Sequence, residues 1–336
     1  MKKLVCAILI LMILLPVLTA SAADKALYTT NGKISAPIYK KMDKSSPSVG
    51  RINEGSTIYV YRIYPEWLYV SCNGDKGYIP RTYTYAGKAI DKTTTPPWGV
   101  EVYRYVGTVG ATGCTILSEP GADGEELISL GENARISIIE LEDGWGKLAY
   151  YRRYGYVNIN ELKELLPVCL DAFSGTDDNP IATFTSYYVV GSDNVSVHGK
   201  EVNIGVNCTY IDGDIVGSGK TLDYNNYYGP FAPRKGYVKG PVLIETGWGL
   251  GNGGGVCQVS STMYDLLLQL PGINILARRS HGPSGIEYLP LDMDAAVGNE
   301  DSGINFIFRN EYDFAIRFEA QAQDGALFLA VYRVTD

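Results

Sequence analysis

The chain has 336 residues, 46% of them hydrophobic, a formal net charge of −8 and an isoelectric point near 5.0. This length is enough for two or three domains, each with its own core. An acidic chain without a basic stripe binds phosphate backbones poorly, so the composition argues against nucleic acid as a partner.

The N-terminus has the pattern of a secretory signal peptide. Lys2-Lys3 is a positive segment, an apolar run extends from Leu4 to Leu18, and Ala20-Ser21-Ala22 has the form of a cleavage site. The sequence therefore predicts a signal peptide over 1–22 and a secreted or cell-wall location outside the cytoplasm. No stable membrane insertion is expected after cleavage. The alternative is an uncleaved anchor, for which the apolar run is short.

Five cysteines remain after cleavage: Cys72, Cys114, Cys169, Cys208 and Cys257. An odd number leaves at least one thiol free or shared between chains. Their spacings match neither a disulfide framework nor a set of metal ligands, so we expect no metal and no cofactor. The first four lie in strand-like or turn-like sequence and are interpreted as structural.

The first half of the chain contains an internal repeat with an offset of 78 residues. Trp67 and Trp145 share this offset, as do Gly77-Tyr78-Ile79 and Gly155-Tyr156-Val157. Each copy has short alternating strands with turn signals between them, which is typical of a small β-barrel. The copies are expected at 30–90 and 101–165, with a linker at 91–100. We interpret both tryptophans as core residues of their barrels.

In these features the repeat resembles bacterial SH3-like (SH3b) domains. The resemblance rests on the tryptophan, the terminal Gly-Tyr-Ile/Val, and the glycine-marked turn before the second strand, Glu54-Gly55 and Gly131-Glu132. The first copy matches better than the second. The resemblance implies binding to peptidoglycan or its stem peptides, for which aromatic side chains offer flat apolar faces with polar edges.

A glycine-rich loop carries Cys257 to the start of an amphipathic helix. The helix is expected over Val259–Leu270, with Ser260, Ser261 or Thr262 as its N-cap and Pro271-Gly272 as its end. Its apolar residues recur at helical spacing: Val259, Met263, Leu266, Leu267 and Leu270.

This setting makes Cys257 a candidate nucleophile. Glycines at 253–255 allow a substrate to approach the backbone closely, and a helix N-terminus favours thiolate over thiol. The competing interpretation is a small, buried apolar residue, which is the commoner role of a lone cysteine.

A cysteine nucleophile needs a base, and the chain has two histidines, His198 and His281. His281 follows a predicted buried strand at Ile273–Ala277. Only a helix, a turn and this strand separate it from Cys257, so the two side chains could meet. The competing interpretation of a lone histidine is a surface or turn residue. That is how we interpret His198, in a turn between strands, although it is also a distant alternative base.

Other groups complete the candidate site. Asp294 is a candidate to orient the imidazole, with Asp292 as a substitute and Glu287 behind them. The oxyanion of an acyl transfer could be bound by the N–H groups of Cys257 and Gln258, or by the Gln258 side chain.

The C-terminal half is expected to be an α+β domain. Alternating segments at Ile304–Phe308, Ala315–Glu319 and Leu327–Tyr332 predict an antiparallel sheet, on which the cysteine-bearing helix packs. The connector to the first half is expected at 162–173, and it could start with a helical turn. The predicted fold class is therefore mainly β, with two small SH3-like barrels followed by an α+β domain over 172–334.

From about Ala172 to Val334 the chain resembles the VanW domain, a family of exported bacterial cell-envelope proteins. The signature is Gly253-Gly-Gly-Val-Cys-Gln-Val-Ser-Ser-Thr262. The residues and segments that match around it are Asn203-Ile204, Ile211-Asp-Gly213, Tyr224-Asn225, Gly229-Pro230, Gly236-Tyr237, Pro241-Val242, Arg279 with His281, Tyr288-Leu-Pro290, Asp294-Ala295 and Phe308-Arg-Asn310. The chain departs from many members after Gly229-Pro230, where Phe231-Ala232 stands in place of Arg-Thr. If that arginine binds a substrate carboxylate in the family, Arg234 is a candidate to do so here.

The resemblance implies L,D-transpeptidation of peptidoglycan, with Cys257 as nucleophile, His281 as base, Asp294 as orienting acid and Gln258 at the oxyanion. The alternatives are a cysteine-dependent carboxypeptidase or amidase on the same polymer, and a non-catalytic wall-binding or assembly protein. The residues expected to line the substrate site are Gly253, Gly254, Gly255, Ser260, Ser261, Asn225, Arg279, Tyr288 and Arg234. Ser260 and Ser261 are more typical of helix capping than of reaction.

Overall fold

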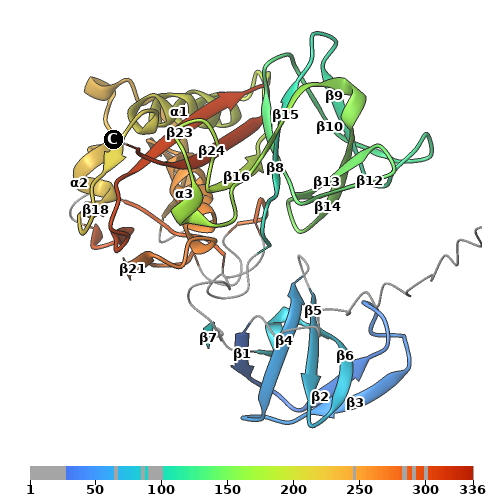
Figure 1. Ribbon diagram of the computed structural model, residues 1–336. Helices are drawn as coiled ribbons and strands as arrows, with labels where there is room; N and C mark the ends of the chain where they lie inside the picture. The colour runs from blue at the N-terminus through green and yellow to red at the C-terminus, as the bar shows by residue number, and fades with distance from the viewer. Residues whose placement is uncertain are drawn as a thin grey trace, which may run out of the picture.

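The computed structural model describes residues 28–63, 67–84, 88–89, 101–244, 247–281, 286–289, 293–298 and 302–335. The predicted signal peptide, the linker and Asp292 lie outside these residues. Within these ranges the chain is mainly β, with three α-helices in its C-terminal half (Figure 1). None of the helices described is both long and apolar enough to cross a membrane.

The first copy of the repeat forms one sheet with the order β3-β2-β6-β5-β4-β1-β7 (Figure 1). Its strands enclose an apolar core that includes Ile38, Ile58 and Val70. Between the described strands the hydrogen-bonded order is open, with β3 and β7 at its ends. The strands are β1 Tyr28–Asn31, β2 Ala36–Tyr39, β3 Ser48–Ile52, β4 Thr57–Ile63, β5 Trp67–Cys72, β6 Asp75–Pro80 and β7 Lys88–Ala89.

The second copy divides into two sheets. One has the order β10-β9-β14-β13-β12 and the other the order β11-β8-β15. The strands are β8 Tyr105–Val109, β9 Cys114–Leu117, β10 Glu126–Leu130, β11 Arg135–Ile138, β12 Glu140–Glu142, β13 Trp145–Tyr150, β14 Arg153–Asn158 and β15 Leu162–Pro167.

The offset of 78 residues seen in the sequence recurs in the strand boundaries. β2, β3, β5 and β6 have counterparts of the same length in β9, β10, β13 and β14, each displaced by this offset (67 to 145 for β5 and β13). Even the short 3₁₀ turn Arg81–Tyr83 has its equivalent in Ile159–Glu161. The two copies therefore share one strand plan.

The tryptophans differ from their predicted role. Trp67 and Trp145 are both half-buried rather than part of the buried cores. Trp67 instead meets Tyr39 edge to face, with ring centroids 5.9 Å apart. Their partial exposure leaves aromatic surface on the outside of each sheet.

The second copy is fused to the C-terminal domain through a shared core. Tyr187 and Ala326, from the C-terminal sheet, belong to the same buried cluster as Ile116 and Leu148 of the second copy. A buried hydroxyl bond between Ser137 and Thr183, 2.7 Å long, crosses the same boundary. The two parts are therefore packed together, and the connector predicted at 162–173 begins as strand β15 rather than with a helical turn.

The C-terminal domain contains two antiparallel sheets and a hairpin. The larger sheet has the order β16-β24-β23-β17, and the smaller has the order β18-β22-β21. The strands are β16 Ala182–Tyr187, β17 Ile215–Val216, β18 Thr221–Asp223, β21 Ile273–Ala277, β22 Ile307–Asn310, β23 Ile316–Gln323 and β24 Ala326–Arg333. The hairpin is β19 Lys239–Ile244 with β20 Gly247–Asn252.

Three helices complete the domain: α1 Val195–Ile211, α2 Tyr224–Tyr228 and α3 Val256–Leu268. Helix α3 packs against β16 and β24, as the apolar stripe requires (Figure 1). The prediction of its start was wrong, because α3 begins three residues earlier, after Gly255 as N-cap. The interpretation of His198 as a turn residue was also wrong, because it lies on the exposed side of α1.

Candidate active site

The loop before Cys257 has a shape that only glycine permits. Gly253 and Gly255 have φ values of +77° and +111°, in the region that disfavours other residues. A Cβ on Gly254 would lie 2.2 Å from the backbone carbon of Gly240 in the facing hairpin. Asn203 of α1 fixes this approach by donating to the Gly254 carbonyl at 2.8 Å. The three glycines therefore place the start of α3 against the hairpin and α1.

Replacing Gly254 by alanine is expected to lower the free energy of unfolding by about 3 kcal/mol, because the new methyl group meets backbone that cannot move aside cheaply. Gly205→Ala is the matched control. It lies in α1, and nothing stands within 4 Å of its added Cβ, so it should stabilise the protein by about 0.5–1 kcal/mol. Urea unfolding of both variants measures the difference. Equal stability of the two variants would contradict the close approach at Gly254.

Cys257 is the one residue of α3 that is not buried. The other 12 residues of this 13-residue helix are inaccessible to solvent, while Cys257 is half-exposed. Its Sγ lies 3.3 Å from the carbonyl oxygen and 3.5 Å from the nitrogen of Val297. It lines a cavity of about 650 Å³ together with His281, Tyr288 and the glycine loop. A thiol in this place is open to a ligand, unlike a core cysteine.

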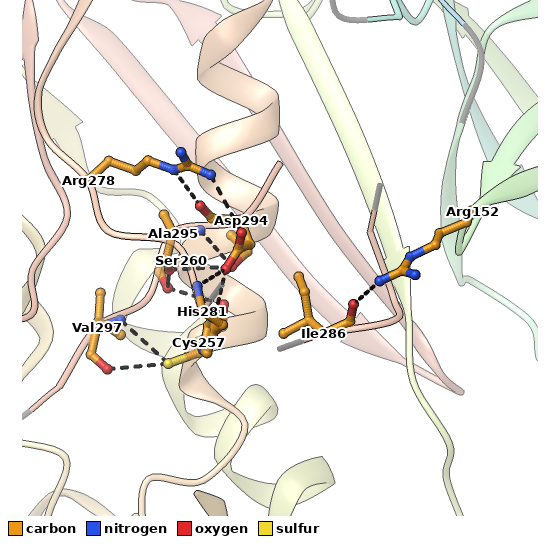
Figure 2. A network of polar contacts seen from close by, with 10 residues as sticks. Arg152, Cys257, Ser260, Arg278, His281, Ile286, Asp294, Ala295 and Val297 are labelled. Carbon is orange, nitrogen blue, oxygen red and sulfur yellow. Dashed lines mark hydrogen bonds and ion pairs between the residues drawn. The ribbon is translucent and has the colours of Figure 1, made fainter. Parts of the chain in front are cut away.

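His281 and Asp294 form a hydrogen-bonded pair beside the thiol (Figure 2). The Nδ1 atom of His281 lies 2.5 Å from Oδ2 of Asp294, and the His281 backbone N–H donates to the same oxygen at 2.7 Å. Asp294 is 2% exposed. Arg278 holds it from the other side, through Nε to its carbonyl oxygen at 2.6 Å and Nη2 to Oδ1 at 3.5 Å. The imidazole is thus fixed in one orientation, which leaves Nε2 for Cys257.

The positive charge of His281 and the negative charge of Asp294 stabilise each other. Burial acts to lower the pKa of His281, but its hydrogen bonds to Asp294 and Cys257 outweigh that effect and raise the pKa from 6.5 to about 9. Burial acts to raise the pKa of Asp294, and the bonds from His281 outweigh it and hold that pKa below its usual value. At neutral pH the site therefore holds an imidazolium between the Asp294 carboxylate and the Cys257 side chain.

This pKa predicts a pH dependence of stability. Because the pKa of His281 is higher in the folded protein than in the unfolded chain, its stabilisation is complete below pH 6.5 and is lost as the pH rises through about 9. The shift corresponds to about 3 kcal/mol. We expect the unfolding free energy of the wild type to fall over this window, and to fall much less in His281→Gln. Parallel urea titrations would contradict this if both proteins lost the same amount.

Other predicted site residues hold the scaffold instead of facing the cavity. Ser260 and Ser261 are fully buried, and both donate to the Ala295 carbonyl, at 2.6 and 3.3 Å. They lie inside α3, so neither is its N-cap. Their bonds fix the segment that carries Asp294, and their burial argues against contact with a substrate.

Gln258 also differs from its expected role. Its side chain is buried, and Nε2 donates to Ser186 Oγ at 3.0 Å and to the Tyr187 carbonyl at 2.8 Å. Its backbone N–H donates to the Gly255 carbonyl at 2.9 Å. Among the described residues the Cys257 N–H has no backbone acceptor, as is usual in the first turn of a helix. That N–H is the donor best placed for an oxyanion.

The remaining predicted residues divide between cavity and scaffold. Arg279 and Tyr288 line the cavity. Asn225 lies in α2, where its side chain donates to the Ile304 carbonyl at 2.8 Å, and Arg234 is exposed outside the cavity lining. Glu287 is exposed and does not contact His281 in the described chain.

Sequence reasoning missed Lys200 and Trp248, which also line the cavity. Lys200 reaches it from α1, and Trp248 from the β19–β20 hairpin, where it is 64% exposed. Both lie outside the signature, and their positions depend on how α1 and the hairpin pack. The exposed tryptophan in a glycine-rich segment was the one signal that pattern reading could have used.

The second copy of the repeat reaches this site. Arg152, in the turn between β13 and β14, donates to the carbonyl oxygen of Ile286 (Figure 2). It also donates to the carbonyl oxygen of Leu289 at 3.3 Å. These carbonyls flank Tyr288. The second copy therefore helps to hold the cavity wall.

The other cysteines are not part of the site. Cys72, Cys114 and Cys208 are buried, and Cys169 is half-buried in the connector. Burial raises the pKa of the Cys114 thiol to about 12. In the described ranges no group of three or more histidine, cysteine or acidic residues could hold a metal ion.

Comparison with known proteins places this site in a defined domain. Residues 199–332 match the family described as VanW like protein. Over these residues the chain is similar to that family. Over 139 residues the chain is 32% identical to "Uncharacterized protein YoaR" of Bacillus subtilis (strain 168), a region that covers 41% of this chain and 45% of that protein. The match thus spans less than half the length of this curated relative.

Two solved structures are similar at low scores. One is an NlpC/P60 family protein from Bacillus cereus ATCC 10987, with 9% identity over 43% of this chain and 58% of that chain and a TM-score of 0.17. The other is NlpC2 from Trichomonas vaginalis, with 11% identity over 86% and 94% and a TM-score of 0.18. The region that matches the family model contains all three residues of the Cys257, His281 and Asp294 group.

Proposed function

We propose that this protein is an exported, cell-wall-associated enzyme that modifies peptidoglycan by acyl transfer through a cysteine thioester, and that its reaction is L,D-transpeptidation. The observation that carries the proposal is the position of Cys257. It is the half-exposed residue of an otherwise buried helix, opens into a cavity, and lies beside an imidazole fixed by a buried carboxylate. That is the arrangement which nucleophilic catalysis by cysteine requires.

In the first half-reaction the Cys257 thiolate attacks the carbonyl carbon before the terminal D-Ala of a tetrapeptide stem. The tetrahedral oxyanion accepts a hydrogen bond from the backbone N–H of Cys257 at the start of α3. As the C–N bond breaks, the His281 imidazolium donates its proton to the leaving nitrogen. D-Ala departs as a free amino acid, and the stem remains bound to Sγ as a thioester.

In the second half-reaction a side-chain amine of a neighbouring stem attacks the thioester. Neutral His281 accepts the proton of that amine, and Asp294 stabilises the imidazolium that forms. Collapse of the oxyanion expels the thiolate and leaves a 3→3 cross-link. If water attacks instead, the product is a tripeptide, so exclusion of water decides between transpeptidase and carboxypeptidase.

The N-terminal copies fit a role in holding the enzyme on its polymer. The first copy carries a run of tyrosines on one face, with Tyr69 in ring contact with both Tyr61 and Tyr78. Lys76 lies over the Tyr61 ring at 4.8 Å. Flat aromatic surface with a cation suits sugars and stem peptides. Tethering of this kind raises the effective concentration of an insoluble substrate, and the resemblance to SH3b domains supports it.

The test is incubation of the mature protein with disaccharide-tetrapeptide muropeptides, with products identified by mass spectrometry. We expect a cross-linked dimer that has lost one D-Ala, and no such product with Cys257→Ala. Cys169→Ala, which removes a half-buried thiol outside the site, is the matched control and should retain activity.

The outcomes separate the three functional classes. Tripeptide without dimer would identify a carboxypeptidase that uses the same thioester. Unchanged substrate with every variant, while the muropeptides still bind, would replace the proposal with a non-catalytic wall-binding protein.

A further inference from the structure

A lysine ammonium lies inside the cavity that holds the reactive cysteine. Lys200 comes from α1 and lines the same cavity as Cys257. Its stem passes the N-cap of α3, where its Cγ is 2.9 Å from the position that a Cβ on Gly255 would occupy. Its Nζ atom lies 5.0 Å from the centre of the Tyr288 ring. Only a glycine at 255 leaves room for this path.

This ammonium has no carboxylate partner among the described residues. Burial lowers the pKa of Lys200 from 10.5 to about 8, and no neighbouring charge offsets that effect. Arg278 differs in this respect, since it is paired with Asp294. A partly buried cation without a counter-charge is costly to keep, and an anionic ligand group would relieve the cost.

The lysine and the reacting cysteine also share their surroundings, since both line one cavity. Gly255, which the lysine stem crosses, is two residues before Cys257. Tyr288 lies beside both Lys200 and Cys257. Lys200 Nζ lies over the Tyr288 ring. Burial, and after it the neighbouring Cys257, raise the pKa of Tyr288. Successive Cα atoms in a peptide are about 3.8 Å apart, so a group one residue beyond the scissile bond stays close to the cavity that Lys200 and Cys257 both line.

We propose that Lys200 binds the C-terminal carboxylate of the residue that leaves from the donor peptide. The site then selects peptides in which one residue with a free carboxylate follows the scissile bond. This inference deepens the proposed acyl transfer and rests on it. It also assigns to Lys200 the carboxylate-binding role that the sequence assigned to Arg234, whose side chain is exposed outside the cavity.

Alkylation of Cys257 tests the cation without requiring turnover. Iodoacetate carries a carboxylate next to its reactive carbon, and iodoacetamide is its neutral counterpart. In Lys200→Met we expect the rate of Cys257 modification by iodoacetate to fall about tenfold or more, while the iodoacetamide rate stays within about twofold. Lys220→Met, on the exposed surface, is the matched control and should change neither rate. Peptide mass spectrometry measures both rates.

Two outcomes of this experiment would overturn the proposal. One is an unchanged ratio of the two rates in Lys200→Met. The other is loss of the ratio in Arg279→Met but not in Lys200→Met, which would assign the carboxylate to the second cation of the cavity lining. Thermal melting of each variant identifies any loss of folding.

The substrate version compares a tetrapeptide stem with its C-terminal carboxamide. With Lys200→Met we expect KM for the free acid to rise about ten- to a hundredfold and KM for the amide to stay unchanged. An equal rise for both peptides would contradict a carboxylate contact. If the wild type acts on neither peptide, the proposed acyl transfer fails, while the alkylation ratio still decides whether Lys200 binds a carboxylate.

Discussion

Replacing His281 by alanine is expected to lower the rate of acyl transfer by about a thousandfold or more. Its imidazole is the group hydrogen-bonded to Cys257, and it supplies the proton to the leaving amine. Without it, the thiol loses both the cation that favours its thiolate form and its acid–base partner. Release of D-Ala from a tetrapeptide, followed by mass spectrometry, measures the rate.

The chain provides an internal control for this variant. It has two histidines, and the second, His198, is exposed on α1. His198→Ala should retain wild-type activity and stability. Modification of Cys257 by iodoacetamide at pH 7 should slow in His281→Ala and not in His198→Ala. Retention of activity in His281→Ala would remove the imidazole from the mechanism.

Replacing Asp294 by asparagine is expected to affect both activity and stability. The carboxylate receives two hydrogen bonds from His281 and faces Arg278. An amide would let the imidazole adopt the wrong tautomer, so kcat should fall by about a thousandfold. It would also remove the negative charge that faces the partly buried Arg278, so the unfolding free energy should fall by about 1–3 kcal/mol.

Glu287→Gln is the control for Asp294→Asn. Glu287 is an exposed acid in the preceding part of the same segment, and its neutralisation should change kcat and stability little. The raised pKa of His281 should also fall towards 6.5 in Asp294→Asn, as NMR titration of the imidazole would show. An unchanged titration would mean that Asp294 does not set the charge of His281.

Several features were accessible from the sequence because they depend on neighbours along the chain. The repeat was visible through matching tryptophan and glycine positions, and strands β5 and β13 begin at Trp67 and Trp145. The apolar stripe indicated helix α3, since helical spacing alone decides which residues share a face. The glycine loop marked Cys257 as unusual.

Other sequence predictions failed where packing competes with local preference. Serine and threonine are good N-cap residues, but Ser260 and Ser261 lie inside α3, where their hydroxyls donate hydrogen bonds to the Ala295 carbonyl. The side-chain amide of Gln258 could donate to an oxyanion, but its Nε2 donates to two residues of β16 instead, Ser186 and Tyr187. Likewise, the strands of the second copy were predicted to form an independent barrel. They share their core with the C-terminal sheet, because Tyr187 and Ala326 of that sheet are buried against them.

The sequence by itself determined the repeat, the cysteine-bearing helix and the candidate nucleophile and base, since local periodicity and residue chemistry carry that information, but it left the orienting acid open between Asp294 and Asp292. Only the tertiary structure decided which side chains face the cavity. It buried the side chains of Ser260 and Gln258, left Arg234 outside the cavity, and brought Lys200 from α1 into the lining of the cavity that holds Cys257. The reason is physical: a side chain's exposure and its partners depend on elements distant in the chain, and no local pattern encodes them.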